Sequence, residues 1–230
     1  MTAPAWEVVL HDGLEQLGLA QRDGVESLLA YTRELARWNE RLGLVHASGS
    51  ELIVRHLLDS VAGLEMVQSL TEGRDAPAIA DIGTGGGLPG IPLSCFLPHA
   101  TIHLIERSER KCGFLGGALL AAKIRNARVV NEDLSALREP FDVIVFRAFQ
   151  PLSAPLVIKL TRLLKPDGAV CAYKGRAERV RAEIASLGDD LAARLHTEMV
   201  PVVVPFLEEE RNLVILRSRA AEAPTPARGS

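Results

Sequence analysis

Apolar residues recur at helical spacing through the first part of the chain. After Asp23 they stand three or four positions apart, and Gly43 follows as a stop signal; the stripe is Leu28, Tyr31, Leu35, Trp38 and Leu42. Asp23 and Glu26 have the spacing of a capping box at the start of this helix. Ser48 and Glu51 repeat that spacing before a second apolar run. We therefore expect residues 1–70 to form a helical extension.

The pattern changes after the polar stretch 71–75, where short β-rich runs begin to alternate with helical ones. Strands are expected at 78–82, 101–105, 127–131, 141–146 and 169–173, with helices beginning near Leu88, Ser108, Ser153 and Ala177. This alternation is typical of a parallel α/β sheet. Runs 200–206 and 213–217 flank the polar turn 208–212 and predict an antiparallel hairpin. We assign 71–219 to this second domain and expect 220–230, which is rich in Ala, Pro, Gly and Ser, to be disordered.

Composition and charge place the chain among ordinary globular proteins. Of its 230 residues 47% are hydrophobic and 24% charged, with a net charge of −3, which argues against the disordered and fibrous classes. The charge-free segment 82–105 is long enough to span a bilayer, but its glycines and prolines exclude a continuous apolar helix. The three cysteines form no C-x-x-C pair, so no metal site is predicted. Without a signal peptide pattern, we expect a cytoplasmic protein that does not bind membranes. We also expect it to act as a monomer.

A glycine-rich loop at 83–87 is the first candidate for chemistry. It follows the first expected strand and opens a helix, a context in which glycines permit a tight turn and close approach to a ligand. Gly85, Gly87 and Gly90 satisfy G-x-G-x-x-G, and Glu106 ends the next strand, where it can accept hydrogen bonds from a ribose diol. S-adenosylmethionine and a dinucleotide both fit these features.

Asp81, at the end of the first strand, favours S-adenosylmethionine. A carboxylate there would repel a pyrophosphate, whereas S-adenosylmethionine carries a cationic amine and a sulfonium but no phosphate. The terminal hairpin agrees by analogy of fold. The expected fold is α/β: a class I S-adenosylmethionine-dependent methyltransferase, Rossmann-like, with a seven-stranded, mainly parallel sheet ending in an antiparallel hairpin.

The loop after the fourth strand, Arg147-Ala148-Phe149-Gln150-Pro151-Leu152, bears on the methyl acceptor. It lacks the (Asn/Asp)-Pro-Pro-aromatic motif of enzymes that methylate base amines, and it contains no nucleophilic cysteine and no His, Asp or Glu. No catalytic base is therefore evident in this loop, although one could come from elsewhere in the fold. An acceptor with a free lone pair and no proton to lose, such as guanine N7, would suit a site built on positioning alone. Segment 159–181 carries seven basic residues against two acidic ones, which indicates either a phosphate contact or a solvated face.

Several motifs resemble the bacterial 16S ribosomal RNA guanine-N7 methyltransferase family, formerly called glucose-inhibited division protein B. They are D-I-G-T-G-G-G-L-P-G-I-P (81–92), R-A-F-Q-P-L (147–152), Y-K-G (173–175), W-N (38–39), H-L-L-D-S (56–60) and R-N-L-V-I-L-R (211–217). Phe146 and Gly86 depart from the family pattern, in which a small residue and a proline are frequent at these places. The resemblance spans residues 28–217.

The resemblance implies methyl transfer from S-adenosylmethionine to N7 of a guanine in the 530 loop of 16S rRNA, at position 527, with S-adenosylhomocysteine as the product. The RNA would be presented by the 30S subunit or an assembly intermediate. Because N7 lies in the deep groove of an A-form helix, the target would have to be irregular or splayed out. By position in the motifs the cofactor-binding residues would be Asp81, Gly83, Gly85, Leu88, Glu106, Glu132, Asp133 and Arg147.

Other functions remain open from the residues themselves. They are a methyltransferase acting on another RNA, a protein or a small molecule; an NAD-dependent oxidoreductase; and a ribosome-binding module without catalysis. The roles of individual side chains are open as well. Arg147 could hold a carboxylate such as Asp81, His56 could bond within the helical extension, and Lys174 could meet phosphate or cap a strand end.

Overall fold

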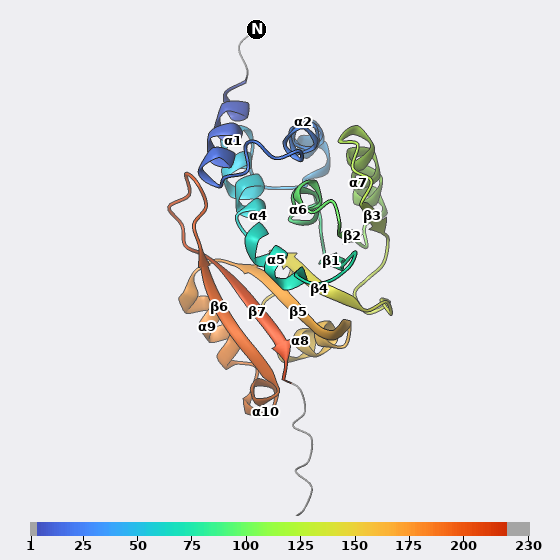
Figure 1. Ribbon diagram of the computed structural model, residues 1–230, viewed down its shortest axis with the longest axis vertical. Helices are drawn as coiled ribbons and strands as arrows, with labels where there is room; N and C mark the ends of the chain where they lie inside the picture. Colours follow the sequence, from blue (N-terminus) through green and yellow to red (C-terminus); the bar gives the residue numbers. More distant parts are fainter. Residues whose placement is uncertain (1–3, 220–230) are drawn as a thin grey trace, which may run out of the picture.

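A seven-stranded sheet forms the centre of the computed structural model, which describes residues 4–219 (Figure 1). The strand order is β3-β2-β1-β4-β5-β7-β6. The first five strands in this order are parallel, and β7 pairs antiparallel with both β5 and β6. The strands are β1 (Ala78–Ile82), β2 (Thr101–Ile105), β3 (Ala127–Val130), β4 (Phe141–Arg147), β5 (Leu164–Lys174), β6 (Leu195–Val202) and β7 (Arg211–Ser218). This is the class I methyltransferase arrangement that the sequence predicted.

Alternate residues of the central strands face two separate hydrophobic cores. Ile79 and Val143 pack with the N-terminal helices, whereas Ala80, Ile144 and Phe146 pack on the opposite face. Strand side chains alternate between faces, so both faces of β1 and β4 must be apolar. The chain order reverses between β1 and β4, and in open α/β sheets a ligand crevice forms at the carboxyl ends of the strands at such a point.

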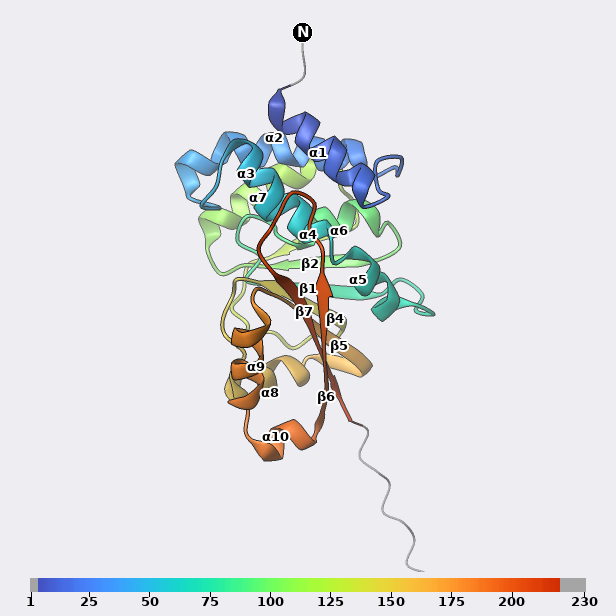
Figure 2. The ribbon, with the colours of Figure 1, turned by 90° about the vertical axis from the view of Figure 1, so that its left-hand side faces the viewer.

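Helices cover both faces of the sheet (Figure 2). One face carries the N-terminal helices together with α6 and α7, and the other carries α8 and α9. The N-terminal helices are α1 (Ala5–Gln16), α2 (Val25–Leu42), α3 (Gly49–Leu52), the π-helix η1 (Ile53–Leu58), α4 (Asp59–Val61) and α5 (Leu64–Thr71). The later ones are α6 (Gly90–Phe96), α7 (Glu109–Ala121), α8 (Ala154–Thr161), α9 (Ala177–Ala185) and α10 (Asp189–Ala193).

The predicted stripe of α2 is confirmed, but its predicted cap is wrong. Leu28, Tyr31 and Leu35 are buried, and Gly43 ends the helix in the left-handed conformation with φ 58°. Gly24 rather than Asp23 is the N-cap, and no side chain caps the helix. A Cβ atom at residue 24 would overlap the carbonyl oxygen of Cys95, so close packing on α6 places glycine there. At the second start Ser48 is the N-cap, again without a side-chain bond.

Other predicted elements are of the right type, but several begin or end at different residues. The helix expected near Leu88 begins at Gly90, β5 begins at Leu164, and β6 runs over Leu195–Val202 instead of 200–206. Helix α10 was not predicted, whereas α1 lies within the expected helical extension but was not predicted as a separate helix. Segment 82–105 contains the end of β1, a loop, α6 and β2, and none of the helices in residues 4–219 is long and apolar enough to cross a membrane.

The N-terminal helices share one hydrophobic core with a face of the sheet. Leu10 and Leu28 belong to the same buried cluster as Ile79, Val143 and Ile215. The division at residue 70 stays a prediction, since this core runs across it. The tail at 220–230 lies outside the described residues.

Candidate active site

The glycine loop between β1 and α6 has a backbone that only glycine adopts readily. Gly83, Gly85 and Gly87 have φ angles of +66°, +57° and +97°, in the left-handed region. A Cβ atom at residue 83 would overlap the ring of Phe149, which arrives from the loop after β4. The loop is tied to the neighbouring strand because Thr84 N donates to Ile105 O at 3.1 Å. Glycine is therefore required at 83 for conformation and for space.

Asp81 anchors this loop from below. Its side chain is fully buried, and Oδ2 accepts hydrogen bonds from Thr84 Oγ1 at 2.5 Å and from Gly90 N at 2.7 Å. Within residues 4–219 the buried Oδ1 atom has no hydrogen-bond partner. Burial raises the pKa of Asp81 to about 6. A buried acid with one free oxygen favours a cationic ligand group close to the loop.

Glu106 lies at the carboxyl end of β2 and holds the other side of the loop. Its Oε2 accepts from Gly85 N at 3.1 Å, and its Oε1 accepts from Ser108 N at 2.8 Å. It lines a cavity of about 290 Å³ at the ends of β1, β2 and β3, which we call the first cavity. The lining residues are Ile82, Gly83, Ile105, Glu106, Arg107, Lys111, Glu132, Asp133, Leu134, Phe149 and Gln150. Three acids thus face one small cavity.

Arg147 ends β4 and is held by the N-terminal helices. Its Nη1 donates to Arg55 O at 3.0 Å and to Asp59 Oδ2 at 3.1 Å, while Nη2 lies 2.8 Å from His56 Nδ1. Burial and the nearby guanidinium lower the pKa of His56 to about 3, so its ring is neutral at pH 7 and Nδ1 accepts. Residues 55 and 56 belong to η1, and π-helical turns often occur at functional sites.

Asp59 joins Arg147 to a second arginine. Its Oδ1 lies 3.2 Å from Nε of Arg211, at the start of β7, and only 6% of the residue is exposed. One carboxylate therefore faces two guanidinium groups, which leaves this trio a net positive charge. Asp59 is the only acidic residue in the mostly apolar segment 52–64. An isolated acid in such a segment indicates that its side chain is buried and paired with another side chain.

These side chains border a larger cavity of about 420 Å³, the second cavity, at the ends of β4 and β5. Its lining residues are Asp59, Arg147, Ala148, Phe149, Gln150, Pro151, Tyr173, Lys174, Gly175, Val202, Arg211, Asn212 and Leu213. Phe149 and Gln150 line both cavities, so the two are neighbours across the loop after β4. Phe146 lies beneath this loop with its ring edge-on to Phe149 at 6.2 Å.

Comparison with known proteins assigns the family. A family model described as GidB, rRNA small subunit methyltransferase G, matches residues 24–214. The chain belongs to this family. A relative from Treponema pallidum (strain Nichols), named ribosomal RNA small subunit methyltransferase G, is 35% identical over 97% of this chain and 100% of its own length. One of the same name from Xanthomonas axonopodis pv. citri (strain 306) is 36% identical over 94% and 96%.

Solved structures agree on the fold of this GidB-family chain. The tRNA (m1A58) methyltransferase of Aquifex aeolicus superposes with a TM-score of 0.56 at 14% identity, covering 70% of each chain. Fibrillarin of Aeropyrum pernix, solved with S-adenosyl-L-methionine bound, superposes with a TM-score of 0.52 at 17% identity, covering 70% of this chain and 76% of its own. At these identities the likeness concerns the fold alone.

The predicted cofactor residues of this GidB-family chain occupy three different places. Gly83, Glu106, Glu132 and Asp133 line the first cavity, and Asp81 and Gly85 shape the loop beside it. Leu88 is buried in the core below the loop, so any contact with a ligand would come from its backbone. Arg147 lines the second cavity and pairs with Asp59 rather than with Asp81.

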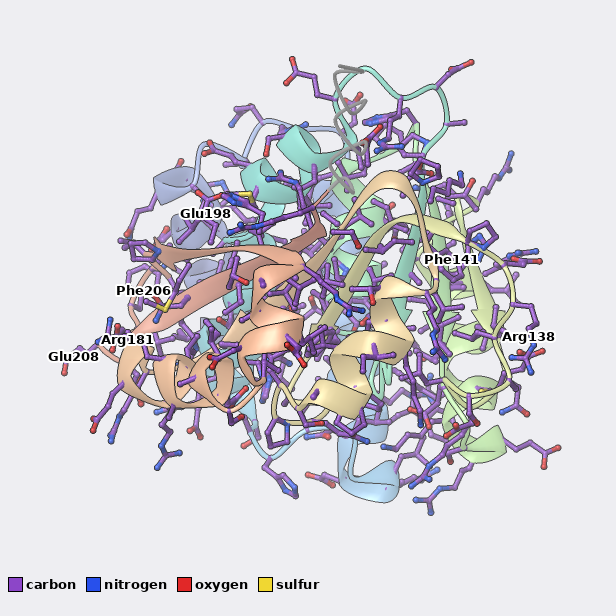
Figure 3. The ribbon with its side chains drawn as sticks, turned by 90° about the horizontal axis from the view of Figure 1, so that it is seen from below. Arg138, Phe141, Arg181, Glu198, Phe206 and Glu208 are labelled. Atoms are coloured by element: carbon purple, nitrogen blue, oxygen red, sulfur yellow. The ribbon has the colours of Figure 1, made fainter. Side chains whose placement is uncertain are left out.

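Two lysines of the basic segment 159–181 are paired with acidic side chains. Lys165 pairs with Asp142 and Lys174 with Glu183, at opposite ends of β5. Lys174 also donates to Gln150 O at 3.1 Å, so it supports the loop after β4. Arg181 stands on α9, and Figure 3 shows it at the same edge of the view as Phe206 and Glu208. These two ion pairs reduce the positive charge that the segment offers to a phosphate.

Sequence reasoning assigned no role to Arg211 or to Tyr31. Arg211 belongs to the R-N-L-V-I-L-R motif, but only the folded chain shows its contact with Asp59. Tyr31, read as one apolar position of a stripe, donates its buried hydroxyl to Gly86 O at 2.6 Å. The helical extension thus reaches the glycine loop as well as Arg147.

Proposed function

We propose that this chain transfers a methyl group from S-adenosylmethionine to N7 of a guanine in the 530 loop of 16S rRNA, at position 527. The observation that carries the proposal is the pair of adjoining cavities, in a chain of the rRNA small subunit methyltransferase G family. One cavity is acid-lined and built on a glycine loop, and the other is larger and positively charged. We further propose that the enzyme acts as a monomer in the cytoplasm on the 30S subunit or an assembly intermediate.

The residues in and around the first cavity fit S-adenosylmethionine. The unpartnered Oδ1 of Asp81 suits the cationic amine, and Glu106 stands where a carboxylate can accept from a ribose diol. Glu132 and Asp133 would border the adenine, and Gly83, Gly85 and the backbone of Leu88 would line the loop side. The buried Nε of Arg147 is unpartnered within residues 4–219, and its guanidinium would meet the methionine carboxylate.

This charge pattern speaks against a dinucleotide. A pyrophosphate against the loop would face Asp81 and Glu106, two acids that already accept hydrogen bonds from the loop's own N–H donors. The same donors are then not free for phosphate oxygens. A loop whose N–H groups already donate to carboxylates therefore favours a cationic cofactor over a phosphorylated one.

The proposed chemistry depends on placement. Bound S-adenosylmethionine supplies an activated methyl group on its sulfonium. Guanine N7 has a free lone pair and loses no proton, so the chain needs to hold the two reactants in line and exclude water rather than to provide a base. Phe149 and Gln150, which border both cavities, stand where the two reactants would meet.

The test is transfer of labelled methyl from S-adenosylmethionine to small subunits that lack the modification, followed by mapping of the labelled base. We expect label on N7 of one guanine in the 530 loop. Calorimetric binding of S-adenosylhomocysteine, with NAD as the control ligand, establishes that the enzyme is competent. Label at another base, or none from enzyme that binds S-adenosylhomocysteine, would overturn the proposed substrate; binding of NAD alone would overturn the proposed cofactor.

A further inference from the structure

We propose that the loop between β6 and β7, residues 203–210, binds a basic protein of the small subunit, with a Lys or Arg side chain of that protein at Phe206 and Glu208. This proposal rests on the proposed function, because it takes the substrate to be rRNA that already carries proteins. Proteins that bind RNA do so through clustered Lys and Arg residues, so a basic protein surface lies beside such RNA.

The loop lies next to the place where the substrate would bind. Val202 and Arg211, the residues on either side of the loop, both line the second cavity. The loop extends beyond the sheet beside the N-terminal helices (Figure 2), and Phe206 and Glu208 lie at the edge of the molecule (Figure 3). A particle of RNA and protein that is held at the second cavity therefore brings its neighbouring surface against this loop.

The loop presents apolar side chains to solvent in a fixed conformation. Val203 is 86% exposed and Phe206 is 53% exposed, whereas Val204 is buried in the core that the sheet shares with the N-terminal helices. Leu207 N donates to Val204 O at 3.1 Å, which closes a turn around Phe206. Phe206 has a φ of +64°, in the left-handed region that a bulky residue adopts only where its surroundings require it. A rigid, exposed aromatic side chain loses little entropy on binding, as an anchor residue of an interface should.

The glutamates of the loop differ in how far the protein itself uses their charge. The loop contains three consecutive glutamates and no basic residue. Glu209 pairs with Arg55 of η1, and the side chain of Glu210 accepts a hydrogen bond from Asn212 at 3.2 Å. Glu208 is exposed and forms no ion pair within the part of the chain that the structure describes. Its carboxylate is therefore the charge that the loop offers to a partner.

A free carboxylate near an exposed aromatic ring suits a Lys or Arg side chain. The cation can pair with the carboxylate of Glu208 and lie over the ring of Phe206, while its aliphatic part covers apolar surface such as Val203. An RNA phosphate would instead be repelled by Glu208. Of the two components of a small subunit, this surface therefore fits a basic protein and not the RNA backbone.

The sign of a charge reversal distinguishes these two partners. Glu208→Lys should raise the Kd of the enzyme for unmodified small subunits about tenfold, since like charges across an interface are costly. If RNA faced the loop, the same variant would lower that Kd, because lysine attracts phosphate, and a lowered or unchanged Kd would overturn the proposal. Glu72→Lys, at an exposed position between α5 and β1, makes the same change of net charge and is the matched control. Co-sedimentation in the presence of S-adenosylhomocysteine measures the Kd without turnover.

Removal of the aromatic ring tests the anchor. Phe206→Asn should fold, because asparagine tolerates the left-handed conformation. We expect the Kd for small subunits to rise about tenfold and the Kd for protein-free 16S rRNA to stay the same. Leu120→Gln, which removes an 82% exposed apolar side chain from α7, should change neither Kd. Equal effects of Phe206→Asn on subunits and on free RNA, or no effect on either, would overturn the proposal.

A photo-crosslink identifies what lies against the loop and separates this proposal from the proposed function. With p-benzoylphenylalanine in place of Phe206, irradiation on purified small subunits should attach the enzyme to a ribosomal protein, at a peptide that contains Lys or Arg. Attachment to RNA alone, or no attachment, would overturn the proposal even where methyl transfer is normal. Methyl transfer by the wild type tests the proposed function separately. If it fails while the crosslink and the changes in Kd are found, the binding surface stands and the proposed substrate atom falls.

Discussion

The two cavities of the site are built in opposite ways. In the first, one stretch of chain, residues 81–107, supplies the glycine turn and the acids that hold it, and the rest of the lining comes from residues 111, 132–134 and 149–150. The second is assembled from segments that range from residue 59 to residue 213 and is held by ion pairs and hydrogen bonds between them. A cavity of the first kind is visible in a sequence, whereas one of the second kind exists only once the chain has folded. The two should also fail differently when single residues are changed.

Asp59→Leu should have the largest effect, because the second cavity depends on this one carboxylate. The change leaves the partly buried guanidinium groups of Arg147 and Arg211 without their counter-charge, and should lower the free energy of unfolding by about 3 kcal/mol, the low end of the range for a broken buried pair. Urea denaturation measures it. Glu51→Leu, which removes an exposed partner of Arg55, is the control and should cost less than about 1 kcal/mol. Equal losses for both variants would show that Asp59 does not organise the cavity.

Asp81→Asn tests the first cavity through its pH dependence. A buried carboxyl whose pKa is raised from 3.8 to about 6 keeps its proton longer in the folded chain than in the unfolded one. Wild-type stability should therefore fall as the pH rises from about 4 to about 6, by about 3 kcal/mol. Asn can accept from Thr84 and Gly90 without charge, so the variant should be more stable at pH 7 and lack this decline, yet bind S-adenosylhomocysteine more weakly.

Thermal unfolding between pH 4 and pH 7 checks this expectation. Asp142→Asn is the matched control, since Lys165 and the N–H of Ala78 lower the pKa of Asp142 in the folded chain. The Asp142 carboxylate therefore stabilises the fold above the pKa that it has in the unfolded chain, and this stabilisation is lost as the pH falls. Its contribution to stability rises with pH, whereas that of Asp81 falls. Identical pH profiles for wild type and Asp81→Asn would contradict the role given to the buried acid.

Gly83→Ala should damage the first cavity and, through Phe149, the wall that it shares with the second. The added methyl meets the ring of Phe149, and the residue must hold a φ of +66°, which together cost about 1–3 kcal/mol. We expect the Kd for S-adenosylhomocysteine to rise about 10- to 100-fold in calorimetry. Gly113→Ala, at an open helical position, should leave binding unchanged and stabilise α7 by about 0.5–1 kcal/mol. An unchanged Kd for S-adenosylhomocysteine in Gly83→Ala would show that the loop can shift to accommodate the added methyl group.

The same contrast explains how much the sequence could predict. Strand positions, the glycine loop and Glu106 followed from local pattern, because period and turn chemistry are properties of neighbouring residues. The π-helical turn at Ile53–Leu58 could not be predicted from local sequence. A π-helix is less stable than an α-helix and forms where tertiary contacts, such as the one from Arg147 to Arg55 O, support it. The cap of α2 was misplaced for a related reason: Gly24 is required by a carbonyl of Cys95, far along the chain.

His56 supports the second cavity, because it helps to hold Arg147 on the wall of that cavity. His56→Leu leaves Nη2 of Arg147 without its acceptor at 2.8 Å, and an unmet buried donor costs about 1–3 kcal/mol. We expect kcat/KM to fall about 5- to 100-fold. His56→Asn offers an oxygen near the place of Nδ1 and should recover part of that loss. Wild type and His56→Asn should have the same dependence of rate on pH between pH 6 and pH 8, because a His56 pKa near 3 keeps the ring neutral there. Equal activity in the two variants would reduce His56 to a packing residue.

Arg181→Gln should have the smallest effect, and it tests whether the second cavity extends onto α9. Arg181 lies near Glu210, whose pKa it helps to lower, so its charge is partly offset before any RNA arrives. Each phosphate contact adds about 0.9 to the slope of log K against log salt for a duplex and about 0.7 for a single strand. We expect Arg181→Gln to lower that slope by less than one full contact and to raise the KM for the subunit about twofold. Arg138→Gln, at the opposite edge of the view in Figure 3, should change neither quantity. An equal change in both variants would mean that the RNA responds to the net charge of the protein, and that the binding surface ends at the β7 side of the second cavity.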